Sequence, residues 1–387
     1  MVALASHILW RKLFISNDID RKILTNPSLA IGAWISRAGK FSLSFCFTTV
    51  GFLSQERIEI ATSILPFREH WEHLEGHLTE RQWLPICSAI SEGAPLLQYL
   101  DIRTDLSVVP QIHISATPVL QTLKLDSFHR ILGLGACKRS LQHLSVHVRN
   151  LDECMSYLDN CPNLEVFELN GCTLATKSTG VRILEMPRMF KLELDIPFAE
   201  PLLNRLHLPV LKSLRFGSCD AGSVVSSFIR RCAAPLESLT ISAKAGDFYP
   251  DDLFDCLRCC PALTHLAVNN RMRLSNADMD QLQLRSQDDI CPRLEHIDII
   301  HCIKGNISHV EDMVLSRWEG TLNLVPLASL ECTSGQTCHW ERSLRKLSLG
   351  ACEFADYSSK TSDPFIWRPR IAKCVKEGLE VFEYLRW

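Results

Sequence analysis

The sequence predicts an α/β solenoid, in which short parallel strands line a curved, concave sheet and helices cover its outer side. Three observations predict this fold class. A phrase of the form Leu-x-x-Leu-x-Leu recurs along most of the 387 residues, and its copies follow one another at a nearly constant spacing. Several copies are also preceded by a stretch in which apolar residues recur with the period of a helix.

The phrase occurs ten times, with Ile, Val, Phe or Met replacing Leu at some positions. The first apolar residues of successive copies are 23, 21, 23, 25, 22, 25, 27, 31 and 50 residues apart. Most of these spacings lie at or near the period of leucine-rich repeats, about 20–29 residues. The copies are Leu97-Leu100-Ile102, Leu120-Leu123-Leu125, Leu141-Leu144-Val146, Leu164-Phe167-Leu169, Met189-Leu192-Leu194, Leu211-Leu214-Phe216, Leu236-Leu239-Ile241, Leu263-Leu266-Val268, Leu294-Ile297-Ile299 and Leu344-Leu347-Leu349.

The last two apolar positions of each phrase predict a strand, because residues two apart on a strand point to the same face. The first apolar position then lies in the turn that enters the strand. Each repeat is therefore expected to be a helix, a turn and a strand, and stacked repeats bury the apolar face that no single repeat can bury. Helical spacing precedes several phrases, as in Leu151-Met155-Leu158, Val224-Val225-Phe228-Ile229 and Leu253-Phe254-Leu257.

Seven of the 17 cysteines recur at fixed places in the repeat. The place after the strand suits a small side chain that donates a weak hydrogen bond to buried backbone. The long chain and an N-terminus without a secretory layout favour reduced thiols and a cytoplasmic or nuclear location. The uncharged stretch 41–55 is too short to span a bilayer. The cysteines are Cys172, Cys219, Cys302 and Cys352, eight residues after the first Leu, and Cys161, Cys260 and Cys291, three residues before it.

The segment from Cys161 to Cys172, Cys-Pro-Asn-Leu-Glu-Val-Phe-Glu-Leu-Asn-Gly-Cys, resembles the cysteine-containing class of leucine-rich repeats that is typical of F-box proteins. Residues 1–90 lack the phrase and are expected to cap the first coil, whereas 91–387 form the repeat domain with an irregular insertion near 319–342. Stretches at 9–15, 31–39, 41–45 and 70–74 resemble the segment that follows the F-box in F-box-like families of mushroom-forming fungi, and 374–381 resembles their closing segment.

The resemblance implies a non-catalytic substrate receptor of an SCF-type ubiquitin ligase, which holds a protein for ubiquitin-dependent degradation. An F-box is a helical module that opens with Leu-Pro, and none precedes Leu9. We therefore expect either that the F-box was lost or that the start of the chain is truncated. Skp-type linker and cullin subunits are expected as partners only if an F-box exists upstream. The alternative is a ligase-independent scaffold that kept its repeats after losing the F-box.

Catalytic, metal-binding and cofactor-binding patterns are weak. The chain holds 41 basic and 44 acidic residues, which excludes a strongly basic nucleic-acid binder. Cys256-x-x-Cys259-Cys260 lacks the second Cys-x-x-Cys pair of a zinc site and is better interpreted as the end of a repeat helix. His70, His73 and His77 share one face only on a helix, and the resemblance places 71–78 on a strand. Cys332, Cys338 and His339 could form a ligand or nucleophile cluster, but nothing nearby orients them, so a loop is favoured.

We therefore expect no enzyme activity, cofactor, metal, nucleic acid or membrane, and a protein partner on the concave face, the surface that solenoids commonly use for binding. The residues expected there lie between or beside the apolar strand positions. They are Tyr99, Asp101, Lys124, His143, Glu168, Lys191, Glu193, Asp195, Arg215, His265, His296 and Asp298.

Overall fold

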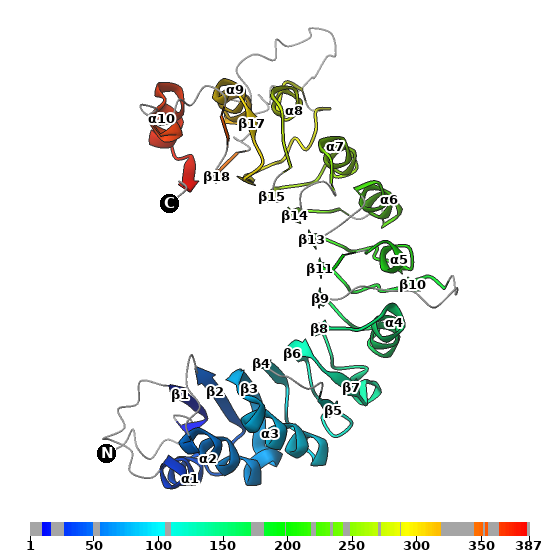
Figure 1. Ribbon diagram of the computed structural model, residues 1–387, viewed down its shortest axis with the longest axis vertical. Coiled ribbons are helices and arrows are strands. Elements are labelled where there is room, and N and C mark those ends of the chain that lie inside the picture. Colours follow the sequence, from blue (N-terminus) through cyan, green and yellow to red (C-terminus); the bar gives the residue numbers. More distant parts are fainter. Residues whose placement is uncertain are drawn as a thin grey trace, which may run out of the picture. The chain divides into compact units, whose positions relative to one another are not determined.

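The computed structural model describes residues 10–16, 27–48, 55–104, 110–171, 182–197, 199–217, 222–232, 235–242, 248–269, 272–286, 288–318, 344–350, 353–354 and 364–384. The chain divides into two compact units, Met1–Met189 and Phe190–Trp387. In each unit, parallel strands form a sheet and helices lie on one side of it (Figure 1). The predicted α/β class with a large parallel sheet is thereby confirmed.

The sheet of the first unit has the order β1-β2-β3-β4-β6-β8-β9, and each neighbouring pair is parallel. Its strands are β1 (Lys12–Ser16), β2 (Leu43–Thr48), β3 (Trp71–Leu78), β4 (Tyr99–Thr104), β6 (Thr122–Phe128), β8 (His143–His147) and β9 (Val166–Asn170). The helices and short strands around it are α1 (Pro27–Ala38), α2 (Gln55–Ser63), η3 (Leu65–His70), α3 (Glu80–Glu92), β5 (Gln111–His113), β7 (Arg130–Leu132), η4 (Leu134–Cys137), α4 (Leu151–Asn160) and β10 (Leu184–Glu185).

Residues before position 90 already contribute the strands β1, β2 and β3. Trp71–Leu78 forms a strand, as the resemblance implied. Because β3 pairs with β4, the sheet of this unit continues through the boundary expected at residue 90. The region expected to cap the first coil therefore adds strands of its own to the sheet.

The expectation of a helix in every repeat was wrong for two repeats of the first unit. The described residues between β4 and β6 contain the short strand β5, and those between β6 and β8 contain β7 and the single turn η4. Buried Ile112 and Ile114 alternate with exposed neighbours, which is the period of a strand rather than of a helix. Gly133 starts η4 with a φ of 82°, a left-handed conformation that favours glycine.

The sheet of the second unit has the order β11-β13-β14-β15-β16-β18-β20, again with parallel neighbours. Its strands are β11 (Lys191–Asp195), β13 (Ser213–Phe216), β14 (Ser238–Ser242), β15 (His265–Asn269), β16 (His296–Ile300), β18 (Lys346–Gly350) and β20 (Glu380–Tyr384). The remaining elements are α5 (Glu200–Leu203), β12 (Leu206–His207), α6 (Gly222–Cys232), α7 (Pro250–Arg258), α8 (Asn276–Gln281), β17 (Lys304–Gly305), α9 (Ile307–Trp318), β19 (Glu353–Phe354), η5 (Phe365–Trp367) and α10 (Pro369–Lys376).

The apolar positions of the phrases lie in register and form the core. In the second unit Leu192 pairs with Leu214, and the same position continues through Leu239, Leu266 and Ile297, all of them buried. The first position of each phrase is buried in the turn before its strand, as expected. At about 25 cal/mol per Å² of apolar surface removed from water, these rows are the main source of stability.

A repeated backbone hydrogen bond extends the parallel ladder into the turns before the strands. The amide of Lys212 donates to the carbonyl of Phe190, that of Glu237 to Lys212, and that of Thr264 to Glu237, at 2.8–2.9 Å. The cysteine after the strand acts as expected where it is described, because the Cys302 thiol donates to the carbonyl of Ile300 at 3.0 Å. Cys172, Cys219 and Cys352 lie outside the described residues.

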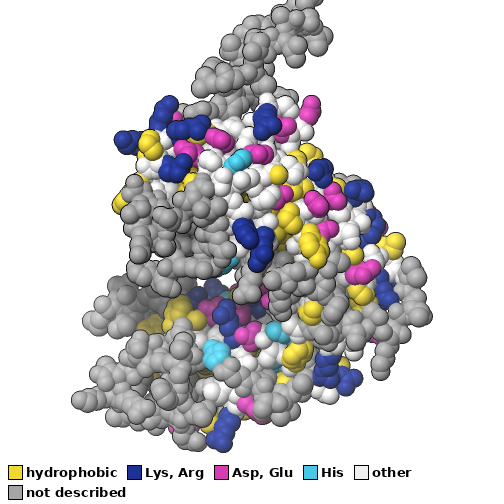
Figure 2. Space-filling view, turned by 45° about the horizontal axis from the view of Figure 1, so that its top comes forward, with side chains coloured by type: hydrophobic (Ala, Val, Ile, Leu, Met, Phe, Trp, Pro, Cys, Tyr) yellow, Lys and Arg dark blue, Asp and Glu magenta, His cyan; other side chains and the backbone are white. Residues whose placement is uncertain are grey.

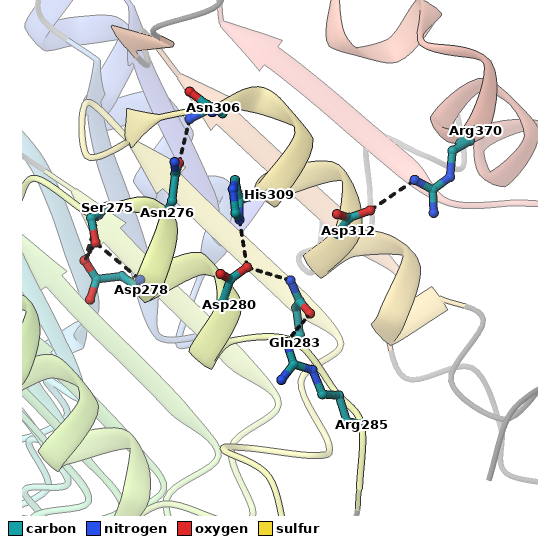
Figure 3. A network of polar contacts seen from close by, with 10 residues as sticks. All are labelled: Ser275, Asn276, Asp278, Asp280, Gln283, Arg285, Asn306, His309, Asp312 and Arg370. Atoms are coloured by element: carbon teal, nitrogen blue, oxygen red, sulfur yellow. Dashed lines mark hydrogen bonds and ion pairs between the residues drawn. The ribbon is translucent and has the colours of Figure 1, made fainter. Parts of the chain in front are cut away.

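Polar contacts tie neighbouring repeats together on the helical side of the second unit (Figure 3). The Asp280 carboxylate accepts from Gln283 on its own repeat and contacts His309 Nδ1 on α9, both at 2.8 Å. Farther along α9, Arg370 of α10 donates to Asp312 at 3.0 Å. Within the described part of the chain, none of the helices has the length and apolar character that crossing a membrane requires.

Candidate functional site

The face of each sheet opposite the buried rows is polar, and we call it the open face of that unit. In the first unit its residues are set by the strand register, which places them in three rows. They are Lys12, Ser44, His73, Tyr99, Thr122, His143 and Val166, then Phe14, Cys46, Glu75, Asp101, Lys124, Ser145 and Glu168, and then His77, Arg103, His147 and Asn170.

The open face of the second unit follows from the register in the same way. Its first row begins at Lys191 and its second row at Glu193. The residues are Lys191, Ser213, Ser238, His265, His296, Lys346 and Glu380, then Glu193, Arg215, Thr240, Ala267, Asp298, Ser348 and Phe382. Asp195 follows two positions after Glu193 on β11 and is exposed.

All of the predicted surface residues lie on strands and alternate with buried residues. Tyr99, Asp101, Lys124, His143 and Glu168 belong to the open face of the first unit. The rest belong to the second unit, and they are Lys191, Glu193, Asp195, Arg215, His265, His296 and Asp298. The space-filling view shows basic, acidic and histidine side chains interspersed on the displayed side of the molecule (Figure 2).

An aromatic and acidic group occupies the middle of the first unit's open face. The rings of His73 and Tyr99 stack with centroids 4.1 Å apart. His73 Nε2 lies 3.0 Å from Glu75 Oε2, and the Tyr99 hydroxyl donates to Asp101 at 3.1 Å. Burial and the Asp101 carboxylate raise the pKa of Tyr99 to about 12, so its hydroxyl stays protonated and can donate.

Cys46 lies beside this group and is a thiol rather than a thiolate at neutral pH. Burial, together with its hydrogen bond to Glu75, raises the pKa of Cys46 to about 11. Because the thiolate is the nucleophilic form, this cysteine is poorly suited to covalent chemistry. The carboxylates nearby are engaged by neighbouring side chains, an arrangement that orders this part of the open face.

Comparison with known proteins does not assign the chain to a family. No protein-family model matches the chain, and no curated protein matches it.

Charged pairs and rings also order the open face of the second unit. Lys191 Nζ lies 2.8 Å from Glu193 Oε1, and Arg215 Nη1 lies 3.7 Å from Glu193 Oε2. The rings of His265 and His296 meet edge to face with centroids 4.1 Å apart. Lys346 Nζ lies 4.8 Å from the centroid of the Phe382 ring, in a cation–π contact.

The structure describes two of the three candidate metal or nucleophile clusters that the sequence offered. Cys256 is buried on α7, and the helix ends at Arg258 with Cys259 as its C-cap, as the helix-end interpretation expected. His73 and His77 lie on the open face while His70 lies in η3 before the strand, so the three do not share a face. Among the described residues, no group of three or more His, Cys, Asp or Glu side chains could hold a metal ion. Cys332, Cys338, His339 and the insertion near 319–342 lie outside the described residues.

Sequence reasoning missed the contribution of the first strands to the open face. Ser44, Cys46, His73 and Glu75 belong to strands that lack the Leu-x-x-Leu-x-Leu phrase. The alternation of Leu43, Phe45 and Phe47 with smaller residues was the available signal, because it has the period of a half-buried strand.

Proposed function

We propose that the chain is a non-catalytic protein-recognition module of the leucine-rich-repeat class, and that its open face binds a protein partner. The observation that carries this proposal is the register of polar side chains across successive strands, beside rows of buried leucines. Repeats stacked in this way offer an extended surface on which many side chains act together. Binding requires no chemistry from the chain itself.

The partner's role is proposed from the resemblance to F-box proteins. The chain acts like the substrate-receptor part of an SCF-type ubiquitin ligase and brings a protein substrate close to the subunits that transfer ubiquitin. Proximity is the contribution of such a receptor. The ligase-independent scaffold differs only in lacking the linker and cullin subunits among its partners, so one experiment separates the two.

The test is affinity purification of the full chain followed by mass spectrometry, with two matched variants. Lys124→Glu with Glu168→Lys exchanges two charges on the open face of the first unit without changing net charge. The control, Lys138→Glu with Asp152→Lys, exchanges two exposed charges near η4 and α4. We expect partners that the wild type and the control retain and the open-face variant loses.

The outcomes separate the hypotheses. Linker and cullin subunits among the retained proteins support the ligase receptor. Reproducible open-face partners without those subunits support the scaffold. If all three proteins capture the same set, the open face is not the binding surface and the proposal fails.

A further inference from the structure

Asp298 is an unsatisfied carboxylate on the open face of the second unit. It lies on β16 between Ala267 of β15 and Ser348 of β18. Its Oδ1 atom is shielded from solvent and has no hydrogen-bond partner among the described residues, while the residue as a whole is half-buried. A buried polar atom without a partner loses the hydration of the unfolded chain and receives nothing in return.

The other carboxylates that order the open faces differ from Asp298. Glu193 has Lys191 and Arg215, Glu75 has His73, and Asp101 accepts from Tyr99. Their neighbours on the same face therefore supply the positive charge or the donor. At Asp298 a carboxylate oxygen is left for a donor from outside the chain.

The cationic and ionisable neighbours of Asp298 are directed elsewhere. Lys346 Nζ lies over the Phe382 ring, and His265 Nδ1 lies 2.7 Å from the Thr264 hydroxyl. Burial lowers the pKa of His296, and the neighbouring His265 lowers it further, which favours the neutral ring at pH 7. Burial raises the pKa of Asp298, while the positive charge of Lys346 partly opposes this effect. Within the part of the chain that the structure describes, no cation therefore lies in direct contact with the Asp298 carboxylate.

An external group can reach the Asp298 carboxylate only through the part of the side chain that stays exposed, because Oδ1 itself is shielded from solvent. Ala267, its neighbour in the same row, has no atoms beyond Cβ, and Ser348 is short and buried. The edge-to-face rings of His265 and His296 lie one row away, and His265 is exposed. A planar guanidinium can lie against such rings while its N–H groups donate to a carboxylate, which a lysine ammonium does less well.

We infer that Asp298 and the His265–His296 pair form a subsite for an arginine side chain of the protein partner. This inference rests on the proposed function and specifies the chemistry of the partner. The arginine supplies a hydrogen-bond donor and a positive charge beside the Asp298 carboxylate. Binding therefore relieves the unsatisfied carboxylate of the unbound chain as well as adding a contact.

The probe is a randomised peptide library displayed on phage and selected on the full chain. We expect the selected peptides to share an arginine at one position and to bind Asp298→Asn about tenfold more weakly or worse, as expected for a lost hydrogen bond between charged groups. Asp251→Asn, which changes an exposed aspartate on α7 away from the open face, is the matched control and should leave affinity unchanged. Replacing the peptide arginine by lysine should weaken binding more than replacing any of its non-basic residues by alanine.

Asp298→Asn should fold, because it removes an uncompensated charge and keeps the shape of the side chain. Its thermal unfolding midpoint is expected to be equal to or above that of the wild type. Peptides without a shared arginine, or an unchanged affinity for Asp298→Asn, would overturn the subsite. If those same peptides lose binding to Lys191→Glu, the open face still binds and only the subsite is wrong. If neither Asp298→Asn nor Lys191→Glu changes the affinity of the selected peptides, or if no peptide is selected, the result counts against the subsite and the proposed function together.

Discussion

The imidazole Nε2 of His143 lies 3.3 Å from the carboxylate Oε1 of Glu168, across the neighbouring strands β8 and β9. His143 holds the pKa of Glu168 at about 2, against the opposing effect of burial, and Ser145 and Lys124 add to the lowering. Two residues predicted for the binding surface therefore also stabilise it.

The first prediction is that Glu168 makes the stability of the fold depend on pH in acid. A carboxyl whose pKa is lower in the folded state stabilises the fold above its unfolded pKa, and this contribution is lost as pH falls from about 4.5 to about 2. Glu168→Gln should flatten the dependence of the unfolding free energy on pH in this window, measured by urea denaturation. Glu165→Gln, which removes the same charge away from His143, should keep the wild-type slope. Equal slopes for both variants would contradict the prediction.

The second prediction concerns Arg317, a guanidinium on α9 with no exposed surface. It donates to the carbonyls of Leu282, Ile290 and Cys291 at 2.6–2.9 Å, and burial lowers its pKa to about 10. Arg317→Met removes three hydrogen bonds to backbone carbonyls, of which only the Cys291 carbonyl keeps a second donor among the described residues, the amide of Leu294, and should lower the unfolding free energy by about 3 kcal/mol or more.

Arg345→Met is the control for Arg317. The side chain of Arg345 is 63% exposed and pairs with Glu295 at 3.5 Å, so its loss should cost less than about 1 kcal/mol. Chemical denaturation of both variants measures the unfolding free energies. Similar decreases in the two variants would mean that the carbonyls around Arg317 find other donors.

The third prediction concerns a buried histidine beside the core of the first unit. Trp83 Nε1 donates to His129 Nε2 at 2.9 Å, and His129 Nδ1 donates to the carbonyl of Ser127 at 2.7 Å, which describes a neutral ring. Burial lowers the pKa of His129 from its ordinary 6.5. As pH falls, the imidazole therefore takes up a proton at a higher pH in the unfolded state than in the folded state. Below about pH 6.5 the unfolding free energy then decreases by at most about 1.4 kcal/mol per pH unit.

His129→Gln keeps an acceptor for Trp83 and cannot take up the proton, so the unfolding free energy should vary less between pH 7 and pH 5 than it does in the wild type. His113→Gln changes an exposed histidine on β5 and should leave the wild-type dependence unaltered. If the unfolding free energy of His129→Gln varies with pH as much as that of the wild type, the His129 ring is not the source of the pH dependence.

Much of the fold could be predicted because the leucine phrase specifies register as well as strand. Side chains alternate on a strand, so fixing Leu192 and Leu214 in the core also fixes Lys191, Glu193 and Arg215 on the opposite face. The predicted surface residues followed from this rule alone. The chemistry of the surface did not, because the unsatisfied state of Asp298 depends on what the neighbouring strands place beside it, here Ala267 and Ser348.

The strands before residue 90 illustrate the other limit. Leu43 and Ser44 of β2 pair with Trp71 and His73, so β3 holds one extra residue and its buried residues do not alternate as sequence reasoning needs. Gly76 on β3 has a φ of 141°, and a Cβ there would lie 2.2 Å from the carbonyl oxygen of Phe47. Glycine is required at this close approach, but the sequence alone does not distinguish such a glycine from one in a turn.

The last prediction concerns the reactivity of two adjacent cysteines at the end of α7. Cys260 is buried, and burial raises its pKa to about 12, whereas Cys259 is partly exposed. N-ethylmaleimide reacts with accessible thiolates, so in the native protein Cys259 should be labelled at least about tenfold faster than Cys260. Tandem mass spectrometry of the peptide that contains both residues measures this ratio, and labelling in urea, where both should react alike, is the control. A packed helix end protects Cys260 and not Cys259. Equal labelling rates of the two thiols in the native protein would therefore mean that α7 opens on the timescale of labelling.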